Sequence, residues 1–369
     1  MQYLNIPIPI VNRPKLDPDF VPFGIWAHEY RKGAWVPVAI AVERPDGSIC
    51  VRHTVIHGTP QMAQADYRYI ERYVKFLLWS IGGFRIYVCG CDEIAAQLAR
   101  DYAPQGCRRF DWDFFHKLYE RDLEIVSLPL LQCPSPNEEP RPIGGHADGC
   151  RIGFDAGGSD RKVCAVIDED VSALADAMGM NTGSIMGLAM DTSEAVGYVD
   201  QQQNILGWIN ALAFAPVDLD PNATEDEWSR DRGVGCKYFS QDAVIKLAPK
   251  AGISLDSGLS PAEKLKVVQA LMEADDPRAA DIFETIGVYL ACTVVLYAQF
   301  YDLRRLMLLG RVMSGKGGEI ILSTCRRILQ EEFPATADQV QVMLPDENTR
   351  RLGQSVAAAN LPELRKGKL

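Results

Sequence analysis

The spacing of apolar residues in the first third of the chain alternates between that of strands and that of helices. Short apolar runs predict four strands, at residues 36–42, 48–56, 84–89 and 123–128. Helical spacing predicts three helices, at residues 63–80, 92–102 and 111–120. The proline-rich residues 1–22 predict an extended arm that lies on another surface. Strands and helices in this mixed order predict an α/β fold.

A stretch rich in proline and glycine, residues 130–149, predicts a linker. We place the domain boundary there, between an N-terminal α/β domain at 1–148 and a second domain at 149–369. The second domain opens with two predicted hairpins, one with strands at 151–154 and 162–167, the other turning at 191–193. Its later pattern predicts strands at 305–309 and 340–344, and helices at 168–178, 261–274, 277–300, 317–332 and 349–359.

Composition narrows the class of protein. A hydrophobic content of 47% and a charged content of 24% are ordinary for a globular chain, and a net charge of −11 argues against a general nucleic-acid binder. Residues 286–300 are too few and too rich in tyrosine to predict a membrane span, and the N-terminus lacks the basic segment of a signal peptide. Ten cysteines show neither disulfide nor four-ligand zinc spacing, so we expect a cytoplasmic protein with reduced thiols and no zinc.

The first hairpin of the second domain carries the residues that a phosphate cradle needs. Gly157 and Gly158 allow a tight turn and expose backbone N–H groups, and Ser159 adds a hydroxyl. Asp155, at the end of the first strand, is a candidate ligand for hydrated Mg²⁺. An ordinary hairpin with an Asp-Gly-Gly-Ser turn is the alternative for so short a motif.

The order Ile-Gly-Phe-Asp-Ala-Gly-Gly-Ser, followed by Val-Cys-Ala-Val-Ile-Asp, resembles the first phosphate loop of the ROK family of sugar kinases and repressors. That family belongs to the superfamily of actin and hexokinase. The resemblance implies ribonuclease-H-like (actin-like ATPase) domains, with mixed sheets flanked by helices, and ATP and Mg²⁺ as cofactors. The N-terminal domain resembles a degenerate copy of half of this fold, with Glu43 in place of the phosphate-loop aspartate.

The resemblance also implies a catalytic base, which in the family belongs to an Asn-Asp pair at a helix start. The matching pair here is Ile167-Asp168, so Asp168 is the candidate base. A run of strands and helices separates the base from the phosphate hairpin in the family, and that run is missing here.

Two later stretches extend the resemblance. Thr192 and Ser193 match the second phosphate loop, in which Asp191 replaces the first glycine. Gly310 and Arg311 match the adenosine-binding motif, in which Arg311 replaces a second glycine. A plain hairpin remains the alternative for the turn at 191–193.

Trp208 and Asn210 occupy the place of the family's sugar-binding element, whose glutamate and histidine are absent. A tryptophan can stack on a sugar and an asparagine can hydrogen-bond to one, although packing is the commoner role of a tryptophan in such a loop.

Two functions follow from the resemblance. The chain is either an ATP-dependent kinase that phosphorylates a sugar hydroxyl, or a catalytically inactive relative that senses a ligand or serves as a scaffold. The expected ligands are a nucleotide and a sugar, a homodimer is possible, and neither a membrane nor a nucleic acid is an expected partner.

Overall fold

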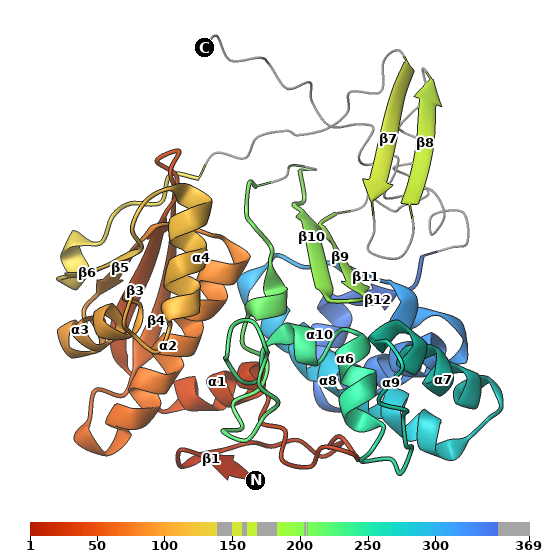
Figure 1. Cartoon of the computed structure of the whole chain (residues 1–369). Coiled ribbons are helices and arrows are strands. Elements are labelled where there is room, and N and C mark those ends of the chain that lie inside the picture. The colour runs from red at the N-terminus through yellow and green to blue at the C-terminus, as the bar shows by residue number, and fades with distance from the viewer. Residues whose placement is uncertain (139–149, 157–160, 168–182, 203, 205, 346–369) are drawn as a thin grey trace.

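The computed structural model describes residues 1–138, 150–156, 161–167, 183–202, 204 and 206–345. Its first four-stranded sheet has the order β4-β3-β5-β6 and lies on the left of Figure 1. The strands are β3 (Val36–Glu43), β4 (Ile49–Ile56), β5 (Arg85–Cys89) and β6 (Glu124–Leu128). β3 is antiparallel to β4 and β5, whereas β5 and β6 are parallel.

Three helices accompany this sheet, α2 (Ala63–Ser80), α3 (Asp92–Asp101) and α4 (Arg109–Tyr119). The strands and helices predicted for this part of the chain are all found, with bounds that differ by two residues at most. α2 is buried around most of its circumference, because it packs against both halves of the chain, and even Arg72 and Lys75 are inaccessible to solvent.

The predicted N-terminal arm contains two short strands, β1 (Gln2–Tyr3) and β2 (Ile6–Pro7), and contacts the distant C-terminal half. The Lys15 ammonium lies 2.6 Å from the carboxylate of Asp281, and the Tyr289 hydroxyl donates to Asp17 at 2.5 Å. The arm leads into a helix that the pattern did not predict, α1 (Phe23–Lys32). Gly24 lets α1 approach Leu296 closely, since a Cβ at this glycine would lie 2.7 Å from the Leu296 Cβ.

The second four-stranded sheet has the order β10-β9-β11-β12. Its strands are β9 (Ile185–Met190), β10 (Glu194–Val199), β11 (Arg305–Leu309) and β12 (Gln341–Met343). β9 and β10 form the predicted hairpin, and β11 is parallel to both β9 and β12. The accompanying helices are α6 (Gln241–Leu247), α7 (Pro261–Glu273), α8 (Pro277–Phe300), α9 (Gly315–Glu332) and α10 (Pro334–Gln339).

The strands of the first predicted hairpin are present as β7 (Cys150–Ala156) and β8 (Arg161–Ile167), which are antiparallel. Among the described residues this hairpin pairs with no other strand, and Figure 1 shows it apart from β9 and β10. The predicted helices at 168–178 and 349–359 lie outside the described residues.

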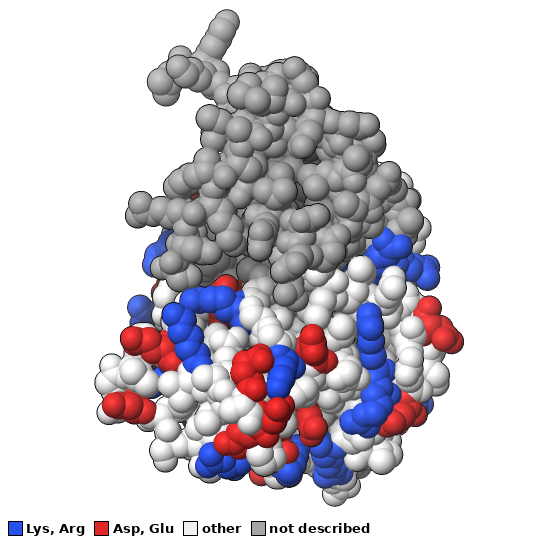
Figure 2. Space-filling view, turned by 90° about the vertical axis from the view of Figure 1, so that its right-hand side faces the viewer, with Lys and Arg blue, Asp and Glu red and all other residues white. Residues whose placement is uncertain are grey.

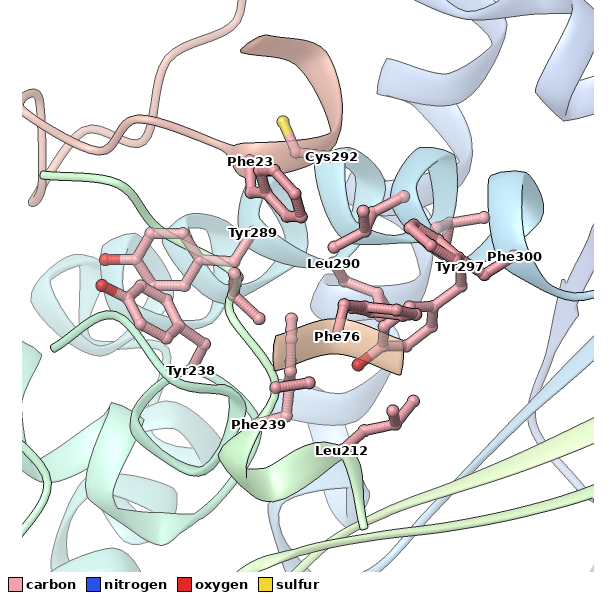
Figure 3. Close-up of a cluster of buried hydrophobic side chains, with 14 of the residues drawn as sticks. Phe23, Phe76, Leu212, Tyr238, Phe239, Tyr289, Leu290, Cys292, Tyr297 and Phe300 are labelled. Carbon is pink, nitrogen blue, oxygen red and sulfur yellow. The ribbon is translucent and has the colours of Figure 1, made fainter. Parts of the chain in front are cut away.

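A continuous apolar core joins the two halves of the chain, and α8 lies at its centre. Figure 3 shows Phe76 of α2 beside Tyr297 and Phe300 of α8, and Phe23 of α1 near Cys292 of the same helix. The rings of Phe76 and Phe300 have centroids 4.1 Å apart. α8 is the one helix in the described ranges that is long and apolar enough to cross a membrane, and 78% of its most apolar window is buried inside the protein.

A buried group of charges also joins the two halves. The carboxylate of Asp231, from the second half, lies 2.9 Å from Arg72, 3.0 Å from Lys75 and 2.7 Å from Arg108 of the first half. Two further carboxylates, those of Glu71 and Asp111, pair with the same cations. Burial opposes the charge on Asp231, but Arg72 and Lys75 outweigh burial and hold its pKa below the ordinary value.

Candidate functional site

Two loops of the second half meet where β9 and β11 end. These strands are parallel neighbours in which Leu309 pairs with Ala189, so their carboxyl ends lie at the same edge of the sheet. The turn at Asp191–Ser193 follows β9, and the loop from Gly310 to Ser314 follows β11 and leads into α9. Ligands of open α/β sheets bind at such an edge. The structure therefore brings the predicted residues Thr192, Ser193, Gly310 and Arg311 together.

The backbone fixes Gly310 in a conformation that suits glycine. Its φ is +93°, and a Cβ at this position would lie 2.3 Å from the carbonyl oxygen of Met190. The loop after β11 therefore passes directly over the last residue of β9. The Arg311 carbonyl is held in turn by the Gln269 side-chain amide, at 2.7 Å.

Arg311 connects the two loops. Its Nε donates to Asp191 Oδ1 at 2.6 Å, and its Nη2 donates to Thr192 Oγ1 at 2.9 Å. Nη2 also forms an ion pair with Asp191. The side chains of Arg311 and Asp191 are 31% and 40% exposed, so the pair lies within reach of a ligand in solution. The pairing of Asp191 with Arg311 was not predicted from the sequence.

The carboxylate of Glu273, at the end of α7, lies at the N-terminus of α9. The backbone N–H of Lys316 donates to Glu273 Oε1 at 3.0 Å, which satisfies one of the free N–H groups of the first turn. The Lys316 ammonium donates to the Glu273 carbonyl at 3.0 Å and to Asp275 at 2.7 Å. Figure 2 shows the side of the molecule that lies on the right in Figure 1, and cationic and anionic side chains are interspersed over its described part.

Glu194 carries a second, buried carboxyl group beside the turn. The Tyr297 hydroxyl donates to its Oε1 at 2.8 Å, while Oε2 is buried without a hydrogen-bond partner. Burial raises the pKa of this carboxyl to about 8, against a smaller lowering by the Tyr297 hydrogen bond. The sequence showed Glu194 only as the first residue of a returning strand and gave no sign of its burial.

Trp208 and Asn210, the predicted sugar-binding residues, have partners within the chain. The Trp208 indole N–H donates to Glu138 at 2.8 Å, and its ring stacks on Tyr198 with centroids 6.1 Å apart. Asn210 is 8% exposed, and its side-chain oxygen accepts from the Tyr301 hydroxyl at 3.0 Å.

The other predicted site residues are described only in part. Asp155 lies in β7, where its backbone is opposite Lys162. Gly157, Gly158, Ser159 and the candidate base Asp168 lie outside the described residues. Within the described ranges, no three His, Cys, Asp or Glu side chains gather as a metal-binding group.

A cavity of about 420 Å³ lies elsewhere, between α1, α8 and α10. Its lining includes Ile25, His28, Val295 and Phe333, and none of the predicted site residues. The cavity therefore lies apart from the predicted phosphate loops.

No protein-family model and no curated protein matches the chain. Among solved structures, it is similar to a ROK family glucokinase from Streptomyces griseus in complex with glucose and AMPPNP, with 17% identity, a TM-score of 0.38, and coverage of 49% of this chain and 61% of the glucokinase. It is similar to the ROK hexokinase from Thermus thermophilus, with 15% identity, a TM-score of 0.36, and coverage of 67% and 69%.

A ROK family transcriptional regulator, a homologue of the E. coli MLC protein, is also similar, with 13% identity and a TM-score of 0.39. That match covers 88% of this chain and 75% of the regulator. The chain thus spans less than two thirds of the glucokinase and about three quarters of the regulator. All three are members of the family that the sequence motifs resemble.

Proposed function

We propose that the chain is a ROK-type, sugar-kinase-like protein that binds a nucleotide at the carboxyl edge of β9 and β11. One observation supports this most strongly. Two sequence motifs more than a hundred residues apart, chosen as the second phosphate loop and the adenosine-binding loop, lie side by side and are connected through Arg311. A guanidinium group is well suited to bind phosphate oxygens, because its donors form a planar fork.

In the catalytic form of the proposal, ATP transfers its γ-phosphoryl group to a sugar hydroxyl. Asp168 would accept the proton of that hydroxyl, and Gly157, Gly158 and Ser159 would hold phosphate oxygens through their N–H groups and hydroxyl. Mg²⁺, when bound, would neutralise phosphate charge, and Asp155 would hold its hydration shell. Trp208 and Asn210 would have to exchange their partners Glu138 and Tyr301 for a sugar.

A thermal-shift titration of the full chain with ATP, with and without Mg²⁺, tests nucleotide binding. A ligand that binds only the folded state raises its stability, by about 2.7 kcal/mol at a hundredfold excess over Kd. We expect a Mg²⁺-dependent rise in Tm that Asp155→Ala abolishes. Asp113→Ala, which removes an exposed aspartate of α4, is the matched control and should leave the rise unchanged. No shift at millimolar ATP would contradict the proposal.

A non-catalytic relative that senses a ligand or serves as a scaffold is the second candidate. It is favoured by the internal partners that Arg311, Trp208 and Asn210 already have. Measurement of ADP release with a panel of hexoses and N-acetylhexosamines separates the two candidates. A catalytic protein releases ADP with one of these sugars, and Asp168→Asn stops the release while ATP binding persists. A non-catalytic protein shows the ATP-dependent thermal shift without ADP release. Under either candidate function, we propose a cytoplasmic protein that forms a homodimer.

A further inference from the structure

The two residues at which the loops replace glycine, Asp191 and Arg311, are the two ends of one ion pair. In a loop that holds phosphate, a carboxylate is unfavourable because it repels the ligand. Here Asp191 Oδ1 instead accepts a hydrogen bond from the Arg311 guanidinium, a group that also suits phosphate oxygens. The carboxylate of Asp191 therefore already neutralises the Arg311 guanidinium, which contacts both loops.

We propose that Arg311 recognises a phosphate group of the ligand and that Asp191 is its intramolecular competitor, so that binding requires Asp191 to leave the guanidinium. This inference rests on the proposed nucleotide site and concerns its regulation. The ligands concerned are those that carry phosphate, whose affinity Asp191 lowers by its pairing with Arg311.

Both ends of the pair are attached to a fixed backbone. The Asp191 N–H donates to the Ser193 carbonyl at 3.1 Å, and the Asp191 carbonyl accepts from the Gln241 N–H at 2.8 Å. Gly310 and the Gln269 amide fix the backbone on either side of Arg311. Exchange of partners therefore requires only rotation of the two side chains, while the loops keep their positions.

The pair is also weak enough to be displaced. Both side chains are partly exposed, and ion pairs of this kind contribute little because water screens them. A terminal phosphate group carries more negative charge than a carboxylate, and like a carboxylate it can accept two hydrogen bonds from the same guanidinium. The chain's own carboxylate thus lowers the affinity for phosphate without abolishing it.

The other cation at this edge is differently placed. Lys316 donates to a backbone carbonyl and to Asp275, and its own N–H is taken by Glu273. Arg311 differs from Lys316 in that its only carboxylate partner among the described residues, Asp191, belongs to the opposite loop.

Calorimetric titration of the full chain with Mg²⁺-ATP and with adenosine tests the inference. We expect Asp191→Asn to tighten ATP binding by about fivefold, the equivalent of an exposed ion pair of about 1 kcal/mol. Adenosine, which lacks phosphate, should bind both proteins equally. Arg311→Gln should weaken ATP binding and cancel the gain in the double variant.

Glu331→Gln is the matched control, because Glu331 forms an exposed ion pair with Arg327 on α9, at 3.0 Å, away from both loops. It should leave the affinity for ATP unchanged. If Asp191→Asn does not fold, Asp191→Ser removes the same carboxylate.

The outcomes separate the inference from the proposed function. If the wild type binds ATP and Asp191→Asn binds it no more tightly, the inference is overturned and nucleotide binding stands. The same holds if Asp191→Asn binds adenosine more tightly by the same factor as ATP. Tighter binding of ATP by Asp191→Asn than by the wild type, with unchanged binding of adenosine, supports the inference. No binding of ATP by any of these proteins overturns the nucleotide site itself and, with it, the competitor role.

Discussion

Glu194 carries a carboxyl group into the interior directly after the exposed turn at 191–193. Its Oε1 accepts from Tyr297 of α8, and its Oε2 has no partner. Burial raises the pKa of this group to about 8, so the carboxyl is mostly protonated at neutral pH. Glu194 thus places a group that titrates near pH 8 in the core, one residue after the turn of the candidate site.

The pH dependence of stability should reveal this group. Between the ordinary value of 4.5 and about 8, the folded state keeps a proton that the unfolded state releases. The contribution of Glu194 is therefore fully present below pH 4.5 and declines as the pH rises to 8, by about 1.4 kcal/mol per pH unit. Glu194→Gln removes the titration, so the free energy of unfolding should fall less steeply between pH 5 and 8. Urea unfolding at several pH values measures this.

The pKa of Asp218 is also raised by burial, to about 6, and it lowers stability over part of the same range. Both proteins contain Asp218, so its effect cancels in the difference between them. Parallel stability curves for wild type and Glu194→Gln would contradict the assignment.

At the level of elements, the candidate site depends on the close approach of the β11–α9 loop to the end of β9. Gly310 permits this approach through its positive φ and its missing side chain. The strands on either side are short, so a shift at this point would disturb the pairing of β9 with β11 and the position of Arg311.

Gly310→Ala should destabilise the protein by roughly 3 kcal/mol, from a strained φ and a contact with the Met190 carbonyl. Gly197→Ala is a matched control in the neighbouring strand β10, because no atom lies within 4 Å of the Cβ position there. It should change the free energy of unfolding by no more than about 0.5 kcal/mol. Equal values for the two variants in chemical unfolding would refute the role of Gly310.

In the whole molecule, the two halves of the chain share one core and one buried group of charges. α8 packs against α1 and α2, and Asp231 reaches three cations of the first half. Cooperative unfolding of both halves follows, because neither the core nor the charges are complete in one half alone.

Asp231→Asn keeps the shape of the side chain but removes its charge. It should cost about 3–5 kcal/mol, because Arg72 and Lys75 would remain buried with too little negative charge. Glu225→Gln in the same loop removes an exposed carboxylate that pairs with Arg230 and Arg232. Its cost should stay below about 1 kcal/mol. A similar Tm for both variants in calorimetry would count against a stabilising role for the buried ion pairs of Asp231 with the first half.

Local patterns predicted the regular elements well and their contacts poorly. The strands of both predicted hairpins and helix α2 follow from alternation and helical spacing, which depend on neighbours in sequence. Helix α1 was missed because its first turn contains no acidic residue and its apolar residues continue from the arm. The pairing of Asp191 with Arg311 joins residues more than a hundred positions apart, and the sequence presented them as two unrelated departures from a glycine pattern.

Hydrogen exchange measured by mass spectrometry, with and without saturating Mg²⁺-ATP, tests the nucleotide site most directly. We predict that ATP slows exchange in the peptides that span residues 187–193 and 309–317, where the two loops meet, and leaves α2 and the first sheet unchanged. Unchanged exchange at both loops, or protection confined to the cavity between α1, α8 and α10, would contradict a nucleotide site at this edge of the sheet.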